Sequence, residues 1–543
     1  MRYFFPKRII FSQNVDNVET LLKEKTLQIG LNEREYAVFK GKSYVILDFG
    51  EEVSGGARIL NYGANEHSVV RLRFGESVSE TCAELGYGFG FATNDHSLRD
   101  FTMALQNYSD MTFGQTGFRF LRVDGVGEGT ELLVKSIVAA VDTDTREELG
   151  GFECDDPLVN EIWTTAACTI RLCLQNGYFW DGVKRDRLVW IGDLYPEMRA
   201  AQCLFGDVPE TENSLAFVQS QTPLSEWMNG IPAYSLWWLI ILADEYAVKG
   251  DKTPFIAYLP YINGLVKQIS EQVKENGETT YSWDFIDWPS CFHETEMKEN
   301  GEVKKSDSHA GVAYLTKIAM QKTAEFLTAC GEDATLCYDI IRRLNSKPQA
   351  VIQYKQIAGL GVWSGDKSDN NKEVLLRGGA KGLSTFMSYP ILTAVAAYGE
   401  YETALAMMKE YYGGMLSVGA TTFWEDFDLD WLENCGRIDE LPQMGKVDIH
   451  GDKGAFCYTG FRHSFCHGWS AGVIPYLAET VAGIHPVGAG RKVFRIQPQL
   501  SGLKHLKIKY PVANGVLEVE HTLQADGSVE TKVQAPDGVE ILK

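Results

Sequence analysis

Residues 45–141 hold short runs in which apolar and polar positions alternate, and glycine and asparagine separate the runs. The clearest runs are residues 44–50, 69–75 and 118–123. A period of two with turn residues between the runs predicts an antiparallel β-sandwich. The first forty residues are less regular, and residues 18–25 are compatible with a short helix or with the approach to a strand.

The period changes at residues 150–157, which contain two glycines, two aspartates and a proline. From Leu158 to Leu174 apolar residues recur at intervals of three and four, so a helix begins here. Asp155 or Asp156 is its expected N-cap, because an aspartate side chain can accept hydrogen bonds from the first free amides. The change of period places a domain boundary between residues 149 and 150.

Helical patterns dominate from that boundary to about residue 485. The clearer segments are residues 193–206, 208–220, 232–249, 254–276, 308–330, 333–346, 383–399, 401–416 and 467–483. The longer expected loops, rich in tryptophan, aspartate and glycine, are residues 281–294, 361–382 and 419–466. About a dozen helices in consecutive antiparallel pairs predict a helical toroid whose inner loops converge on one mouth.

Alternation returns after residue 485, and Asp526-Gly527 has the composition of a hairpin turn. The alternating runs are residues 493–496, 506–510, 515–520 and 530–533. Three domains are therefore expected: a β-sandwich over residues 1–149, a helical domain over residues 150–485, and a small C-terminal β domain over residues 486–543.

The formal charge of -22 argues against nucleic acid and against an anionic membrane as partners. No run of 18 apolar residues and no signal-peptide pattern is present, so we expect a cytoplasmic protein. The 11 cysteines form no CxxC pair and favour reduced, buried thiols. There is no glycine-rich phosphate loop, and the histidines lack ligand spacing, so neither cofactor nor metal is expected.

The stretch from residue 179 to residue 193 carries three carboxylates, three cations and two tryptophans. Asp186 and Asp193 lie five and twelve residues after Asp181, which puts both more than about 100° around a helix from it. One regular helix cannot aim all three at a point, whereas a loop that runs into a helix can. Asp193 would then be the N-cap of that helix. The structural alternative is that Asp193 only caps a helix and that the Arg–Asp pairs are surface ion pairs.

Two further loops, residues 281–288 and 421–431, also place tryptophan beside acids. This combination is typical of carbohydrate sites, because the ring stacks on a sugar face and the acids accept hydroxyl hydrogen bonds. Glycoside hydrolysis also needs one protonated acid and one carboxylate. His467 would hydrogen-bond a substrate hydroxyl, orient an acid, or be a buried structural histidine.

Residues 181–193 resemble the signature loop of the α-L-rhamnosidases of glycoside hydrolase family 78, which are six-hairpin glycosidases. An Asp, an Arg-acid pair, a Trp and a Gly-Asp recur there in the same order. Residues 419–425 are similar to the family's segment ending in Trp-Glu, and residues 464–467 to its Phe-Asn-His. Residues 48–50, 117–120 and 151–163 also fit, so the resemblance covers most of the chain from about residue 45.

The resemblance implies an (α/α)6 barrel catalytic domain flanked by an N-terminal β-sandwich and a small C-terminal β-sandwich. It implies hydrolysis of terminal α-L-rhamnosides with inversion. Asp186 would be the general acid and Glu425 the general base, while Asp181 and Asp193 would hold sugar hydroxyls. The implied remainder of the pocket is Arg185, Trp190, Asp287, Trp288, Trp424 and His467.

Two positions depart from the family pattern: Asp186 replaces the usual glutamate, and Cys466 replaces the asparagine before the histidine. A shorter acid requires a closer backbone, or the acid role belongs to Asp193, or it is lost. The alternatives to a rhamnosidase are therefore a six-hairpin exo-glycosidase for another sugar and a sugar-binding protein without catalysis. The N-terminal domain would pack on the toroid or lend a residue to the pocket, and a homodimer through the β surfaces is a further expectation.

Overall fold

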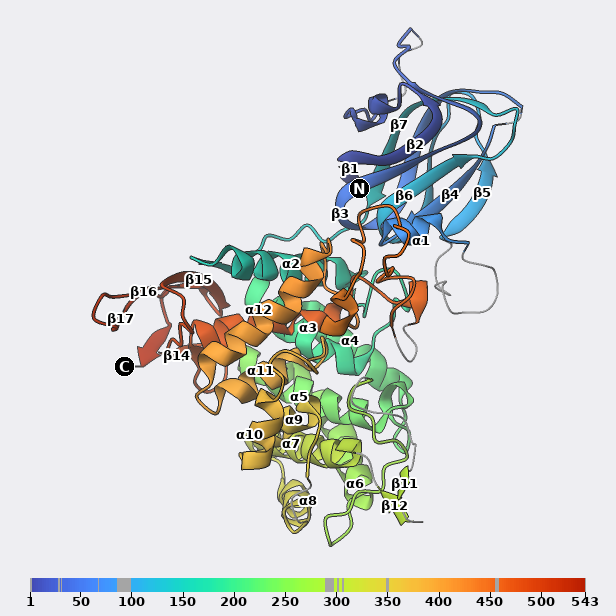
Figure 1. Ribbon diagram of the computed structural model, residues 1–543. Coiled ribbons are helices and arrows are strands. Elements are labelled where there is room, and N and C mark those ends of the chain that lie inside the picture. The colour runs from blue at the N-terminus through green and yellow to red at the C-terminus, as the bar shows by residue number, and fades with distance from the viewer. Residues whose placement is uncertain are drawn as a thin grey trace.

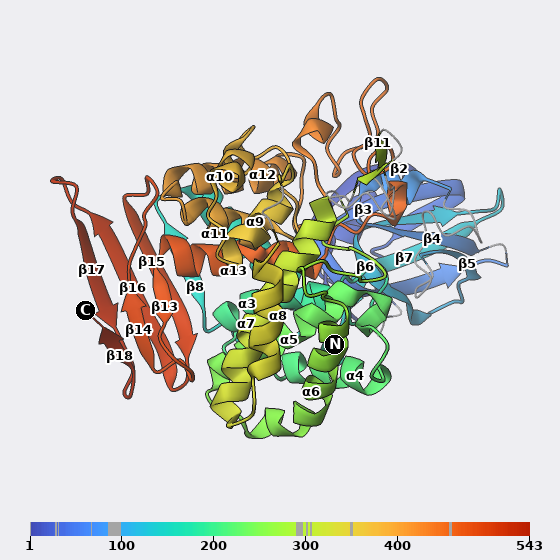
Figure 2. The same cartoon turned by 90° about the horizontal axis from the view of Figure 1, so that it is seen from below.

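Three parts follow one another along the chain: an N-terminal sheet, a large helical part and a pair of small C-terminal sheets (Figure 1). The helical part lies between the two sheet parts, as Figure 2 shows most clearly. The computed structural model describes residues 2–542 except 28–29, 31, 67, 85–98, 289–296, 300–301, 305–306, 348–350 and 455–458. Residues 289–294 of the expected loop 281–294, which include His293 and Glu294, therefore lie outside the described residues.

The N-terminal part is a seven-stranded sheet in the order β1-β7-β3-β6-β4-β5, with β2 paired to β3. Its strands are β1 (Arg2–Phe4), β2 (Arg8–Asp16), β3 (Ala37–Ala64), β4 (Val69–Gly75), β5 (Asp100–Ala104), β6 (Asp110–Gly125) and β7 (Glu131–Val141). The long strand β3 pairs with both β6 and β7 and shifts register several times, so the sheet bends around its own apolar core. A 3-10 turn (Val18–Leu22) occupies the ambiguous early segment, and the short helix α1 (Val78–Cys82) follows β4.

The helical part begins where the change of period predicts it. Asp156 is the N-cap of the first long helix, because its carboxylate accepts hydrogen bonds from Leu158 N at 2.9 Å and Val159 N at 3.4 Å. Asp155, the other candidate, accepts from the backbone amides of Lys504 and His505 instead.

The helices enclose a continuous apolar core that includes Trp237 and Trp238. They are α2 (Pro157–Cys173), α3 (Ile191–Leu204), α4 (Pro209–Gln221), α5 (Pro232–Lys249), α6 (Leu259–Glu271), α7 (Asp307–Cys330), α8 (Thr335–Asn345), α9 (Lys355–Trp363), α10 (Asp369–Leu376), α11 (Ser388–Ala396), α12 (Tyr401–Ser417) and α13 (Val473–Tyr476). In the part of the chain that the structure describes, no helix combines the length and apolarity needed to cross a membrane.

Two helical predictions need correction. Helix α10 lies within residues 361–382, which the sequence assigned to a loop, and helix α9 overlaps the start of that range. Gly359 and Gly361 weaken the helical pattern of α9, yet tertiary packing favours small residues there. A Cβ on Gly359 would lie 3.3 Å from the backbone of Pro390, and a Cβ on Gly361 would lie 2.7 Å from Asn371 Nδ2. The predicted last helix, residues 467–483, is a 3-10 turn, the short α13 and a π turn in succession.

The C-terminal part contains a three-stranded sheet in the order β13-β14-β18 and a four-stranded sheet in the order β17-β16-β15-β8. Its strands are β13 (Ile484–Pro486), β14 (Val493–Ile496), β15 (His505–Val512), β16 (Gly515–Leu523), β17 (Val529–Gln534) and β18 (Glu540–Leu542). Strand β8 (Gly151–Cys154), which precedes the first long helix, completes the second sheet by pairing with β15. Both ends of the helical part therefore meet in one sheet.

Replacing Gly150 by alanine should destabilise the fold. The new Cβ would lie 1.8 Å from the carbonyl oxygen of Cys203. This clash can be relieved only if the backbone at one of the two positions moves. We expect a loss of about 1–3 kcal/mol in the free energy of unfolding, measured in urea. Gly151→Ala is the matched control, because no atom lies within 4 Å of its Cβ position. Equal unfolding midpoints for the two variants would contradict the prediction.

Candidate active site

The loop between β10 (Tyr178–Phe179) and α3 is shaped by its own backbone and by one carboxylate. Asp181 N donates to Leu188 O at 3.1 Å, and Leu188 N donates to Asp181 Oδ1 at 2.9 Å. Gly182 pairs with His467 as an isolated bridge, and a Cβ at Gly182 would lie 2.9 Å from the carbonyl oxygen of Cys466. The close approach requires glycine and joins this loop to the segment before α13.

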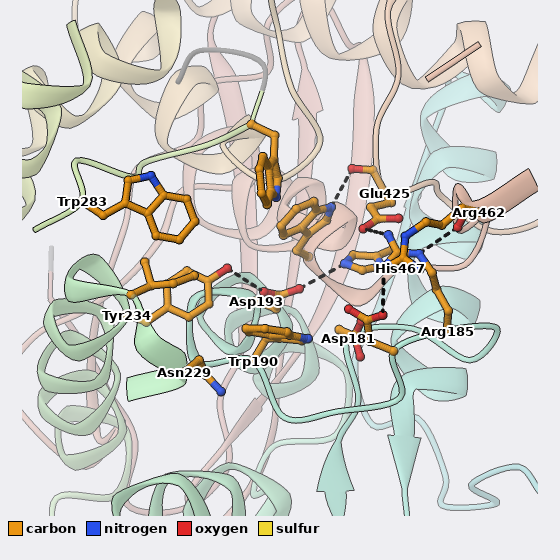
Figure 3. Close-up of a pocket in the computed structure, with 14 residues that line it drawn as sticks. Asp181, Arg185, Trp190, Asp193, Asn229, Tyr234, Trp283, Glu425, Arg462 and His467 are labelled. Atoms are coloured by element: carbon orange, nitrogen blue, oxygen red, sulfur yellow. Dashed lines mark hydrogen bonds and ion pairs between the residues drawn. The ribbon is translucent and has the colours of Figure 1, made fainter. Parts of the chain in front are cut away.

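These loops border a cavity of about 310 Å³ (Figure 3). Four carboxyl groups, two guanidinium groups, one imidazole and several aromatic rings share its wall. The lining residues are Asp181, Arg185, Asp186, Trp190, Asp193, Asn229, Ile231, Tyr234, Trp283, Trp288, Glu425, Arg462, His467 and Trp469.

One guanidinium group lies between two of the carboxylates. Arg185 Nη1 is 3.1 Å from Asp186 Oδ1, and Arg185 Nη2 donates to Glu425 Oε1. Arg462 Nη2 lies 3.7 Å from the same oxygen of Asp186. Burial acts to raise the pKa of Asp186, but Arg185 and Arg462 outweigh it and hold this pKa below its usual range. Asp186 is therefore an anion at neutral pH.

A second carboxyl has neutral hydrogen-bonding partners. His467 Nε2 lies 3.1 Å from Asp193 Oδ2, and the hydroxyl of Tyr234 donates to Asp193 Oδ1 at 3.4 Å. Burial raises the pKa of Asp193 to about 8, while burial lowers the pKa of His467 to about 4. At neutral pH most Asp193 carboxyl groups are thus protonated, and the His467 imidazole is uncharged. Burial also raises the pKa of Asp181 well above its usual range.

Glu425 is held from the backbone side. Ser464 N donates to its Oε2 at 3.2 Å, and the indole of Trp469 donates to its carbonyl oxygen at 2.8 Å. These contacts and Arg185 leave Glu425 with a fixed orientation at the cavity wall.

Two sequence-family models match the chain. The bacterial α-L-rhamnosidase six-hairpin glycosidase domain matches residues 147–354, and the C-terminal domain of the bacterial α-L-rhamnosidases matches residues 483–542. The chain resembles the bacterial α-L-rhamnosidases in these two segments. No curated protein sequence was found to match it.

Solved structures of rhamnosidases share the fold. A rhamnosidase of family GH78 from Bacillus sp. GL1 is 19% identical, with a TM-score of 0.75, over 97% of this chain and 55% of that one. The Streptomyces avermitilis α-L-rhamnosidase complexed with L-rhamnose is 14% identical, with a TM-score of 0.69, over 100% and 50% of the two chains. The Klebsiella oxytoca rhamnosidase with rhamnose bound is 18% identical, with a TM-score of 0.67, over 88% and 95%. The chain therefore spans about half the length of the first two.

Most of the site residues predicted from the rhamnosidase resemblance meet at the cavity. Those that line it are Asp181, Arg185, Asp186, Trp190, Asp193, Trp288, Glu425 and His467. Asp287 and Trp424 lie outside the lining. The carboxyl of Asp287 is buried and accepts a hydrogen bond from Ser384, and burial raises its pKa to about 7. The ring of Trp424 stacks on Phe465 with 4.0 Å between centroids.

Asp193 is not the N-cap of helix α3. The helix already begins at Ile191, after the cap residue Trp190, so Asp193 lies in its first turn with its side chain turned to Tyr234 and His467.

Several lining residues were not anticipated: Asn229, Ile231, Tyr234, Trp283, Arg462 and Trp469. Trp283 belongs to one of the three acid-tryptophan loops, so its loop did carry a signal. Asn229 and Tyr234 come from the turn before α5 and from α5 itself, where nothing in the local pattern marks a site.

Proposed function

We propose that the protein is an inverting glycoside hydrolase that releases terminal α-L-rhamnose from small rhamnosides. One observation carries the proposal: Asp186 and Glu425 are held at the two ends of one guanidinium group in a cavity with aromatic walls. The matching family models and the rhamnose-bound solved structures of similar fold support the choice of sugar. The cavity volume lies near the lower end of the range for ligand pockets, roughly 300–1,000 Å³, and suits one sugar ring.

In this proposal Asp186 protonates the glycosidic oxygen and Glu425 activates the attacking water. An inverting pair requires about 6.5–9.5 Å between the two carboxyl groups, so that a water fits between them and the anomeric carbon. Asp181 and Asp193 accept or donate hydrogen bonds to the sugar hydroxyls, and Trp190, Trp283 and Trp288 offer apolar faces to the ring.

Asp193 is a competing candidate for the acid. It lines the same cavity, and burial raises its pKa to about 8, so it carries a proton at neutral pH where Asp186 does not. A general acid must carry its proton before it can act. The two assignments make different pH predictions, which the Discussion develops.

We further propose that the helices form an (α/α)6 barrel, flanked by an N-terminal β-sandwich over residues 1–149 and a C-terminal β-sandwich over residues 486–543. The sandwich assignments rest on the apolar core of the N-terminal sheet and on the paired C-terminal sheets. The barrel assignment rests on the six-hairpin family match and on the sequential helix pairs.

Proton NMR of the first-formed sugar tests the mechanism. With 4-nitrophenyl α-L-rhamnoside, inversion delivers β-L-rhamnose first, and the α anomer appears later by mutarotation. The α anomer as first product would establish a retaining mechanism and remove the base role from Glu425. Hydrolysis of other aryl glycosides but not of this one would favour an exo-glycosidase for another sugar. Binding of L-rhamnose without any turnover would favour a sugar-binding protein.

A further inference from the structure

A cluster of buried charged groups joins the N-terminal sheet to the back of the cavity wall. Glu76 and Glu80 flank the start of α1, which lies at the end of the N-terminal sheet that faces the helical part (Figure 1). Their side chains are buried, as is that of Lys184 in the loop before α3. Arg99 completes the cluster, and its guanidinium donates to Glu80 Oε1 at 2.9 Å.

Lys184 is the central cation of this cluster. Its Nζ lies 3.1 Å from Glu76 Oε2 and 3.4 Å from Glu80 Oε1, and it donates to the carbonyl oxygen of His463 at 2.6 Å. The cations Lys184 and Arg99 thus face the carboxyl groups of Glu76 and Glu80, and such pairing is needed for buried charges to be tolerated. A third buried carboxyl group, Glu52, lies near them, and burial raises its pKa well above its usual range.

A metal ion is the other species that such a cluster could hold. Glu76, Glu80 and His450 present ligand atoms within 4.8 Å of one another. The Lys184 ammonium, however, is 3.1 Å from His450 Nε2 as well as 3.1 Å from Glu76. Burial and Lys184 lower the pKa of His450 well below its usual range, so the imidazole is neutral. The lysine already supplies the cation, and we assign the cluster a structural link to the site instead.

Glu76 touches both segments that hold the proposed catalytic pair. Its Oε2 accepts a hydrogen bond from Phe465 N at 2.7 Å, next to the Ser464 amide that donates to Glu425. The same oxygen faces Lys184, whose chain neighbour Arg185 contacts Asp186 and Glu425. One carboxylate therefore connects the acid side and the base side of the site.

The backbone of the N-terminal sheet supports the same loop at a second point. Gly117 N donates to Val183 O at 2.8 Å. A Cβ at Gly117 would lie 2.5 Å from Val183 Cγ2 and 2.9 Å from Lys184 N. The N-terminal sheet therefore contacts the loop before α3 at Val183 as well as at Lys184.

We propose that Glu76 is a positioning residue, through which the N-terminal sheet fixes the spacing of Arg185, Asp186 and Glu425. The inference rests on the proposed hydrolase function. It makes the N-terminal sheet a part of the catalytic unit rather than an appendage that only packs beside it.

Glu76→Gln is the test variant, because glutamine keeps the size of the side chain and loses the ion pair with Lys184. Asp48→Asn is the matched control: Asp48 is equally buried in the same sheet and pairs with Arg8 and Arg119, away from the loop before α3. We expect Glu76→Gln to lower kcat for the aryl rhamnoside about 10- to 100-fold, the cost of displacing reacting groups by a fraction of an ångström up to about 1 Å. KM should stay within about twofold, because the sugar contacts of Asp193 and Trp190 remain.

Amide hydrogen exchange tests the positioning role of Glu76 without an activity measurement. Exchange at residues 463–467 should quicken in Glu76→Gln and stay unchanged in Asp48→Asn, since Phe465 N loses its charged acceptor. Gly117→Ala shifts the loop before α3 without changing charge, so it should lower kcat as well. If Glu76→Gln does not fold, this variant tests whether the N-terminal sheet positions the loop. If both kcat and exchange in the two test variants match Asp48→Asn, the inference is overturned. If the unaltered chain shows no turnover, the proposed function fails, and hydrogen exchange alone decides the positioning role.

Discussion

Glu425→Gln should lower kcat/KM for 4-nitrophenyl α-L-rhamnoside about 10³-fold, equivalent to about 4 kcal/mol of transition-state stabilisation. The amide cannot accept a proton from water, so the attacking nucleophile loses its general base. The loss should fall mainly on kcat, because base catalysis acts in the transition state and not in binding. L-Rhamnose binding, followed by tryptophan fluorescence, should persist in the variant.

Glu433→Gln is the matched control for this substitution, because Glu433 lies in the same long loop but is exposed. Its kcat/KM should remain within about twofold of the unaltered chain, as is usual for surface changes. Turnover of Glu425→Gln at the level of this control would refute the base assignment.

Asp186→Asn should lower kcat/KM about 10³-fold for a rhamnoside with an alcohol leaving group. A 2,4-dinitrophenyl rhamnoside should lose less than about tenfold, since its phenolate leaves without a proton and acid assistance grows with the basicity of the leaving group. The comparison of the two substrates separates loss of the acid from general damage to the site. Asp193→Asn is measured in parallel, and the opposite ranking of the two variants would transfer the acid role to Asp193.

The pH dependence of kcat/KM independently distinguishes Asp186 from Asp193 as the general acid. A general acid is active below its pKa, and activity falls as pH rises through that pKa. Arg185 and Arg462 hold the pKa of Asp186 below its usual range, so Asp186 as the acid predicts a falling limb already in the acidic range. The pKa of Asp193 is about 8, so Asp193 as the acid predicts activity that persists to about pH 8.

The sequence predicted those features of the fold that depend on short-range chemistry. The aspartate pair before Pro157 marked the start of the helical part, because an N-cap acts on amides two and three residues away. The β alternation in residues 506–510 likewise reports which side chains face a core within one strand, whereas residues 45–49 are buried on both faces of the sheet. Two glycines in α9 hid a helix, because the close packing against α10 and α11 that favours them is a tertiary property.

The site was predictable in its charged loop and less so in its walls. Trp424 and Trp469 illustrate the limit, since both follow the composition expected of a sugar site. The ring of Trp424 stacks on Phe465 in the core, whereas Trp469 lines the cavity. Local sequence does not show which ring faces the cavity and which packs in the core, because this depends on packing partners from other segments. The N-cap prediction for Asp193 was wrong for the same reason, because Tyr234 and His467 reach its side chain from distant parts of the chain.

The pairing of β8 with β15 constrains the order in which the chain can fold during synthesis. His505 donates its amide to Asp155 across 350 residues of sequence. At about 5–20 residues per second, a ribosome needs roughly 20–70 s to make that length. Throughout this interval the β8 edge has no partner strand, although the N-terminal sheet can already fold. The nascent chain is therefore open to wrong strand pairing for tens of seconds, and a chaperone that shields this edge would raise the yield of native protein.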